Sequence, residues 1–178
     1  MKKLLIYDRS NPMKLWVNNL WPIGASIFKS SFDEVVGVSS IAEFFLMLHA
    51  HKPDHVQLWG HALSGEPMIG LDKLSAKDPR WAMRDIYEVW FRSCSVAQGK
   101  EGVAFMRNLA EQRIDVAAHL SDIGYWGLHS NLVGVRAGET PWWSEDLKPG
   151  PSSPLQPRTV SAARMCLPRW TYRKHPPL

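Results

Sequence analysis

Two side chains that can act as a base or a nucleophile each follow a short apolar run of this chain. His61 follows residues 55–59 and Cys94 follows residues 89–92, and a glycine, Gly65 or Gly99, comes soon after each. A thiol becomes a strong nucleophile when a nearby base or positive potential stabilises its thiolate. If the two runs are neighbouring strands, their carboxyl ends face one crevice. The sequence therefore predicts a histidine–cysteine pair.

The elements that must position this pair alternate between strands and helices. Apolar runs bounded by turn residues predict strands at 3–7, 34–38, 55–59, 89–92, 114–118 and 132–136, with a short extended piece at 66–70. Capping and periodicity predict a helix after Ser40 to about residue 51, a second at 78–87 and a third from Gly99 to about residue 112. Residues 13–33 have no clean period. This alternation favours an α/β fold with a mostly parallel sheet covered on both faces.

The loop around Cys94 is suited to nucleophilic attack. Small residues at positions 93, 95, 97 and 99 leave the thiol accessible, and the predicted helix after Gly99 adds positive dipole potential. The backbone amides of Cys94 and of Ala62 are the natural donors to an oxyanion. A single cysteine or histidine at a strand end is more often structural, but the same context on two consecutive strands favours catalysis.

Several short segments in this half of the chain carry a family resemblance. The His61 segment, Cys94-Ser-Val-Ala-Gln-Gly, Gly102-Val-Ala-Phe, Leu109-Ala and Asp115-Val-Ala-Ala resemble the caspase–gingipain superfamily of cysteine peptidases. In particular they are similar to an uncharacterised bacterial caspase-like domain found in adhesin-like repeat proteins. The resemblance covers roughly residues 55–143, and the part that follows Cys94 is its more specific portion.

The resemblance implies a three-layer α/β/α sandwich in which His61 and Cys94, on consecutive strands, form a catalytic dyad. Their separation, 94 − 61 = 33 residues, suits gingipain-like members. The chain departs from the family pattern where Ala62 replaces a glycine after the histidine and Ser95 replaces an asparagine. His119 also stands where related sequences have a small residue.

A substrate pocket is implied at the end of the first strand, because several relatives build part of theirs there. Asp8 and Arg9 occupy this place. An acidic wall would favour a basic substrate residue and an arginine wall an acidic one, so both specificities stay open. We take Asp8 as the wall, with Asp122 as a second candidate, while turn capping by Asp8 is an equally good interpretation.

Length and composition predict one α/β domain at 1–143 and a proline-rich linker with a basic tail at 144–178. The chain has 178 residues, 45% of them hydrophobic, and a net charge of +4. Lysine and arginine are scattered except in the tail, which argues against a nucleic-acid partner. A free thiol at Cys94 is favoured over a disulfide to Cys166. No apolar run is long enough to cross a bilayer, so we expect no membrane partner and a cytoplasmic location.

Other constellations are weaker. His49, His51 and His55 with Asp54 lack metal-ligand spacing because Pro53 interrupts them, so no metal is predicted. No phosphate-binding glycine loop or serine elbow is present, and no cofactor is expected. An exposed Trp142–Trp143 pair would form a patch for a protein partner.

The pattern as a whole predicts a cysteine endopeptidase whose His–Cys dyad cleaves peptide bonds in protein or peptide substrates. The alternative is a catalytically inactive caspase-like module that binds another protein as a decoy, inhibitor or adaptor. Fast alkylation of Cys94 at mildly acidic pH would favour the enzyme. A tight complex that survives loss of Cys94 and His61 would favour the module.

Overall fold

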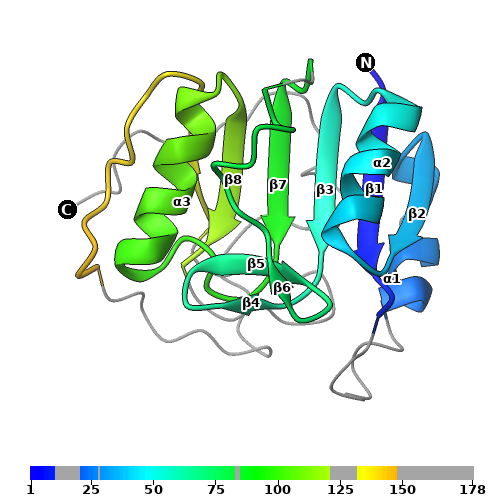
Figure 1. Ribbon diagram of the computed structural model, residues 1–178, viewed down its shortest axis with the longest axis horizontal. Coiled ribbons are helices and arrows are strands. Elements are labelled where there is room, and N and C mark those ends of the chain that lie inside the picture. The colour runs from blue at the N-terminus through cyan, green and yellow to red at the C-terminus, as the bar shows by residue number, and fades with distance from the viewer. Residues whose placement is uncertain (11–20, 28, 83–84, 121–131, 148–178) are drawn as a thin grey trace.

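The chain folds into an α/β domain with a mostly parallel sheet, as the sequence predicts (Figure 1). The computed structural model describes residues 1–10, 21–27, 29–82, 85–120 and 132–147. The strands in these ranges are β1 (Lys3–Asp8), β2 (Glu34–Val38), β3 (His55–Trp59), β4 (Ala62–Leu63), β5 (Glu66–Ile69), β6 (Asp72–Lys73), β7 (Glu88–Arg92), β8 (Asp115–His119) and β9 (Leu132–Val135). The α-helices are α1 (Trp21–Ile27), α2 (Ile41–His51) and α3 (Gly99–Glu111), and a 3-10 turn, η2, spans Lys29–Ser31.

Six strands form the main sheet in the order β2-β1-β3-β7-β8-β9. The first five are parallel, and β9 pairs antiparallel with β8. The order reverses at β1, which has β2 on one side and β3 on the other. In open α/β sheets such a switch point leaves a crevice at the carboxyl ends of the strands. This edge, which carries the ends of β1, β3 and β7, is therefore where a site is expected.

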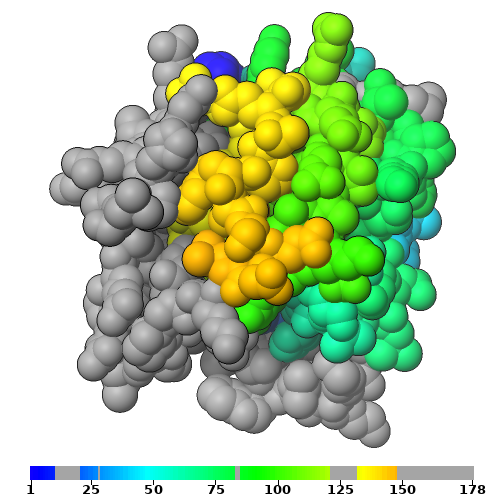
Figure 2. Space-filling model, turned by 90° about the vertical axis from the view of Figure 1, so that its left-hand side faces the viewer, coloured from blue at the N-terminus to red at the C-terminus, as the bar shows by residue number. Residues whose placement is uncertain are grey.

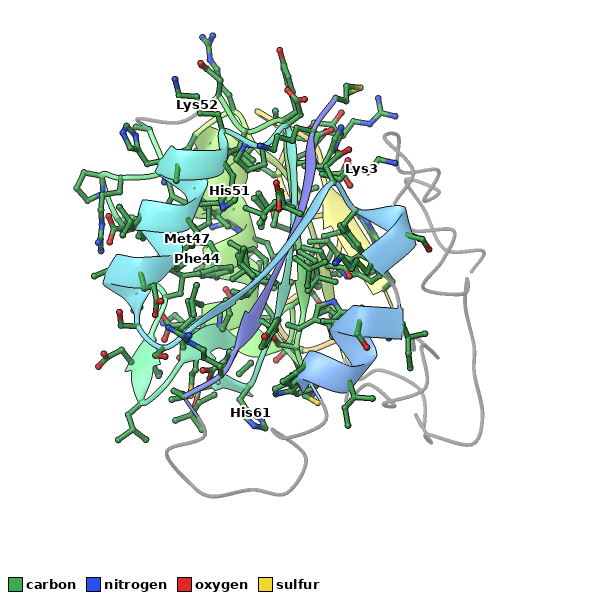
Figure 3. All side chains as sticks on the ribbon, turned by 90° about the vertical axis from the view of Figure 1, so that its right-hand side faces the viewer. Lys3, Phe44, Met47, His51, Lys52 and His61 are labelled. Carbon is green, nitrogen blue, oxygen red and sulfur yellow. The ribbon has the colours of Figure 1, made fainter. Side chains whose placement is uncertain are left out.

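The two faces of the sheet bury different residues because side chains alternate along a strand. Leu4 and Ile6 of β1 pack with α2 and α3 in the main core, whereas Leu5 packs with Ala25 of α1 and Trp59 on the other face. Figure 3 shows α1 and α2 on opposite sides of the sheet. Each predicted strand of the sheet is present, with ends that differ by at most one residue from the prediction.

The capping pattern at the start of α2 is confirmed. Ser40 Oγ accepts a hydrogen bond from the Glu43 N–H at 3.1 Å. In a capping box the Glu43 carboxylate would accept from the N–H of Ser40. Here it accepts from the N–H of Ser39, one residue earlier, at 2.7 Å. The same carboxylate binds Arg9 Nη2 at 2.6 Å, which ties the end of β1 to this helix.

The predicted helix at 78–87 is wrong. Residues 79–82 form turns, and Asp78 before them accepts hydrogen bonds from the Arg80 backbone and guanidinium and so has a lowered pKa. Trp81 is drawn into the core, where its ring meets Phe44 and its Nε1–H donates to the Ser75 carbonyl at 3.0 Å. Burying one large ring in a turn outweighs the weak helical signal of this segment.

A small antiparallel meander, β4-β5-β6, lies at the carboxyl edge below β7 (Figure 1). Ser64 and Gly65 link β4 to β5 with positive φ angles of 52° and 78°, the pattern of a tight type I′ hairpin. The sequence predicts only the β5 part of this meander. No helix in the ranges described above is long and apolar enough to cross a membrane.

Two glycines join the β4–β5 hairpin to the segment that carries Cys94. A Cβ on Gly65 would lie 2.4 Å from the Gly102 nitrogen, and a Cβ on Gly102 would lie 2.4 Å from the Val96 carbonyl oxygen. Backbone therefore meets backbone at both points, with no flexible side chain that could move aside. The hairpin after His61 and the turn after Cys94 are packed on the first turn of α3 from two sides.

Gly65→Ala is predicted to destabilise the protein more than Gly138→Ala. The two glycines have nearly equal φ angles, 78° and 77°, but a Cβ on Gly138 meets nothing within 4 Å. Both variants incur the left-handed cost of about 1–2 kcal/mol, and Gly65→Ala adds overpacking of about 1–3 kcal/mol. Urea unfolding measures the difference. Equal losses in the two variants would contradict the close packing at Gly65.

Candidate active site

Counted on from the register of β3 and β7, His61 and Cys94 fall at matching positions just after these two neighbouring strands. The pairs run from His55↔Glu88 to Trp59↔Arg92, so each partner lies 92 − 59 = 33 residues further along the chain. His61 and Cys94 are also 94 − 61 = 33 residues apart, each two residues beyond the last pair. Figure 3 shows His61 at the end of the sheet opposite Lys3 and Lys52. Both side chains lie beyond the carboxyl edge and are partly exposed.

The register between β1 and β3 extends this alignment to Arg9. Tyr7 pairs with Trp59, so Arg9 falls level with His61. Its guanidinium donates from Nε to Ser39 Oγ at 3.0 Å and from Nη2 to the Glu43 carboxylate at 2.6 Å. Arg9 is thus an exposed cation at the carboxyl edge that is already ion-paired.

Cys94 opens a tight turn that ends at Ala97. Ser95 has a left-handed φ of 55°, and its carbonyl accepts from the Gln98 N–H at 3.2 Å. Ala97 donates its N–H to the His119 carbonyl at 3.0 Å and accepts from the Trp143 indole N–H at 3.0 Å. The turn is therefore fixed at its far end by two distant parts of the chain. Cys94 is in no disulfide and is half-buried, so a small reagent can reach it.

His61 lies between an aromatic ring and a carboxylate. The Trp21 ring of α1 meets the imidazole edge to face, with centroids 6.1 Å apart. Burial lowers the pKa of His61 below its ordinary 6.5, and the negative charge of Asp8 opposes this by raising the pKa. Burial is the larger effect. His61 is therefore neutral at pH 7, which is the form that accepts a proton.

A row of aromatic and charged side chains runs beneath the site on the α1 face of the sheet. Trp21 meets Trp59 with centroids 6.3 Å apart, and the buried Arg92 guanidinium lies 4.3 Å from the Trp59 ring and 6.0 Å from that of Trp90. A cation over aromatic faces is attracted by their negative charge density. Arg92 and Trp59 are the paired residues two positions before Cys94 and His61.

His119 lies at the end of this row, and its hydrogen bond with Trp90 determines which ring nitrogen carries the proton. Its Nε2 accepts the Trp90 indole N–H at 3.2 Å, and the residue has no exposed surface. Because Nε2 must carry a lone pair here, the neutral ring bears its proton on Nδ1. The role of His119 is thus to hold Trp90 with its side chain and Ala97 with its carbonyl.

The amide of Ala62 is oriented away from its partner strand. Ala62 pairs with Pro67, which has no N–H, while the Met68 N–H donates to the His61 carbonyl at 2.8 Å. In an antiparallel ladder, backbone groups point alternately toward and away from the partner. The Ala62 N–H therefore points away from β5. Ala62 lies in an extended strand, a conformation that alanine adopts as readily as the glycine of the family pattern.

Asp8 is buried, with 1% of its surface exposed, and its carboxylate faces inward. It accepts from the Ser10 N–H at 2.8 Å, the Ser10 hydroxyl at 2.6 Å and the Gly70 N–H at 3.1 Å. This geometry favours turn capping, and substrate binding by Asp8 stays a prediction. Asp122, the other predicted wall, lies outside the described residues.

The Trp142–Trp143 pair does not form the exposed patch that the sequence left open. Trp143 is 5% exposed and belongs to the main core, and Trp142 packs against that core with its ring 5.5 Å from Trp143. The cause is the Trp143 hydrogen bond to Ala97, 46 residues away, which draws the segment inward. The pair therefore offers no exposed patch for a partner.

Sequence reasoning does not assign a role at the site to three residues that the structure places there or beside it: Trp21, His119 and Trp143. The sequence signals were a tryptophan outside any clean period, a histidine in place of a small residue and a tryptophan beside prolines. None of these local signals indicates which distant residue the side chain contacts in the fold. Within the described ranges, no three His, Cys, Asp or Glu side chains gather as a metal site requires.

Comparisons with protein-family models and with curated protein sequences give no match for this chain. The resemblance to the caspase–gingipain superfamily therefore stays a prediction that depends on the residues quoted for it. The geometry of the carboxyl edge carries the functional argument.

Trp21→Ala and Asp8→Asn are predicted to shift the pKa of His61 in opposite directions. Removing the Trp21 ring admits water, so the pKa rises toward 6.5, whereas removing the Asp8 charge lowers it further. NMR titration of the imidazole, assigned with His61→Ala, measures both shifts. A pKa that stays the same in both variants would contradict the environment described for His61.

Proposed function

We propose that this protein is a cysteine endopeptidase of caspase-like architecture, with His61 and Cys94 as its dyad. The observation that carries the proposal is the 33-residue register of β3 and β7, which His61 and Cys94 continue past the last pair. When two adjacent parallel strands are followed by a base and a thiol at the same level, the two side chains can face the same space. Nucleophilic catalysis by cysteine requires this arrangement.

The proposed reaction uses the neutral form of His61. The imidazole takes the Cys94 thiol proton as Sγ attacks the scissile carbonyl carbon, and it then gives that proton to the leaving amine as the C–N bond breaks. A water molecule hydrolyses the resulting thioester, with His61 as the base again. The amides of Ala62 and Cys94 are the proposed donors to the oxyanion. The ladder geometry of Ala62, whose N–H points away from β5, supports this role.

The architecture supports the same assignment. The sheet has five parallel strands and an antiparallel last strand, with α1 on one face and α2 and α3 on the other. This is compatible with the three-layer sandwich that the resemblance implies. The proposed substrates are proteins or peptides. We place the reaction in the cytoplasm, where thiols stay reduced.

Cys94 is predicted to react with iodoacetamide at least tenfold faster at pH 6.5 than it does in the His61→Ala variant. An ordinary thiol, with a pKa of about 8.5, is only about 1% thiolate at that pH, whereas His61 can accept the proton of a paired thiol. Second-order rates from pH 5 to 9, in a Cys166→Ser background, give the comparison. Identical profiles with and without His61 would rule out the dyad.

Cys94→Ala is predicted to abolish cleavage of fluorescein-labelled casein, whereas the matched variant Cys166→Ser keeps it. Each substitution removes one of the two thiols of the chain, and Cys94 is the one that follows β7, the strand paired with the strand before His61. Gel analysis after prolonged incubation measures cleavage. Casein turnover that survives in Cys94→Ala would overturn the peptidase proposal and favour the interaction module.

A further inference from the structure

We propose that Trp143 is a positioning residue for the Cys94 thiol, acting through Ala97. The inference depends on the proposed role of Cys94 as the nucleophile, and it assigns a function to a tryptophan far from that residue in sequence. Trp143 touches the turn that carries Cys94 rather than the reacting atoms.

Ala97 is fixed by two elements that are remote from it in sequence. It has no exposed surface, its N–H donates to the His119 carbonyl at the end of β8, and its carbonyl accepts the Trp143 indole N–H. Both distances are 3.0 Å. A buried carbonyl that loses such a donor cannot turn to water instead. The Trp143 N–H is therefore needed for Ala97 to stay where it is.

The position of Ala97 bears directly on Cys94, because both belong to one tight turn. Ser95 holds a left-handed φ of 55°, which is uncommon for a residue other than glycine. On the other side of the turn, the Val96 carbonyl is so close to Gly102 that a Cβ there would lie 2.4 Å away. The turn thus packs against α3 at Val96 and is held at Ala97 by the indole N–H of Trp143 and the carbonyl of His119.

Trp143 itself is held by a segment that is fixed to the fold upstream. The Ala137 N–H donates to Asp115 Oδ1 at 2.7 Å, and the Gly138 N–H donates to the Ala110 carbonyl at the end of α3 at 2.8 Å. From there the chain runs beside α3 toward the carboxyl edge (Figure 1). Figure 2 shows residues 132–147, in yellow to orange, packed against the green part of the chain. The indole N–H therefore approaches Ala97 from a fixed direction.

Trp143→Phe tests the proposal, with Trp142→Phe as the matched control. Both changes replace an indole by a phenyl ring in neighbouring residues, but the buried Trp142 Nε1 has no hydrogen-bond partner among the described residues. In a Cys166→Ser background, two quantities are measured for each full-length variant. They are hydrogen–deuterium exchange of residues 94–98 and the pH profile of Cys94 alkylation by iodoacetamide.

We expect Trp143→Phe to speed exchange at 94–98 roughly tenfold and to slow alkylation at pH 6.5 roughly tenfold. Its pH profile should move toward that of His61→Ala, because the thiol leaves the reach of its base. Trp142→Phe should change neither quantity. A general loss of stability would speed exchange along the whole chain, and urea unfolding of both variants gives the correction.

Equal exchange at 94–98 in the two tryptophan variants would overturn the contact through Ala97. Faster exchange in Trp143→Phe with an unchanged alkylation profile would overturn the positioning role. If wild type and His61→Ala share one alkylation profile, the proposed function fails and the positioning role fails with it. Exchange then still decides whether Trp143 fixes the turn, so the two failures are distinguishable.

Discussion

The pairing of β3 with β7 in one register is the constraint on which the carboxyl edge depends. Both faces of these strands are buried, with Leu58 and Phe91 in the main core and Trp59 and Trp90 on the other face. A slip of one residue would exchange the two faces, so burial on both sides excludes it. A slip of two would keep the faces but move His61 past Cys94 by about 7 Å. The core residues of the two strands thus determine whether a base and a thiol can meet.

The second face of the sheet is unusual because it buries a cation in aromatic surroundings. Arg92 is 3% exposed and lies against Trp59 and Trp90. Burying a charge costs several kcal/mol unless other groups compensate for it, and the two indole faces contribute part of that compensation. This face also holds Trp21 against His61 at one end of the row and His119 against Trp90 at the other. The high tryptophan content is therefore partly explained as a rigid layer beneath the site.

The sequence predicts the strands of the sheet well because buried strands are continuous apolar runs bounded by turn residues. It predicts α2 and α3 for a similar local reason, since the cap of α2 and the apolar periodicity of both helices are visible within one segment. It fails at residues 78–87, where an aspartate before a proline resembles a helix start but Asp78 is bound by Arg80 and Trp81 turns into the core. It fails again at Trp143, whose partner is 46 residues away. Such contacts leave no mark on the local pattern.

The candidate site shows the same division between local and long-range information. His61 and Cys94 stand out in the sequence because each follows its own strand, but the equality of their separation with the strand register appears only in the paired sheet. Ala62 and Cys94 can be proposed as oxyanion donors from position alone. The direction of the Ala62 N–H depends on the pairing of β4 with β5 and on Pro67 opposite, which the sequence does not predict.

The electrostatics of His61 suit two opposing requirements of the general base that we propose it to be. The imidazole must be neutral before it takes the thiol proton, and it must tolerate the positive charge afterwards. Burial beside Trp21 favours the neutral form, and the charge of Asp8 favours the protonated one. Ser10 and Gly70 fix Asp8 from two sides, so the β5–β6 hairpin holds this carboxylate in place. The buried Asp8 thus serves the site better as a fixed charge near His61 than as an exposed pocket wall.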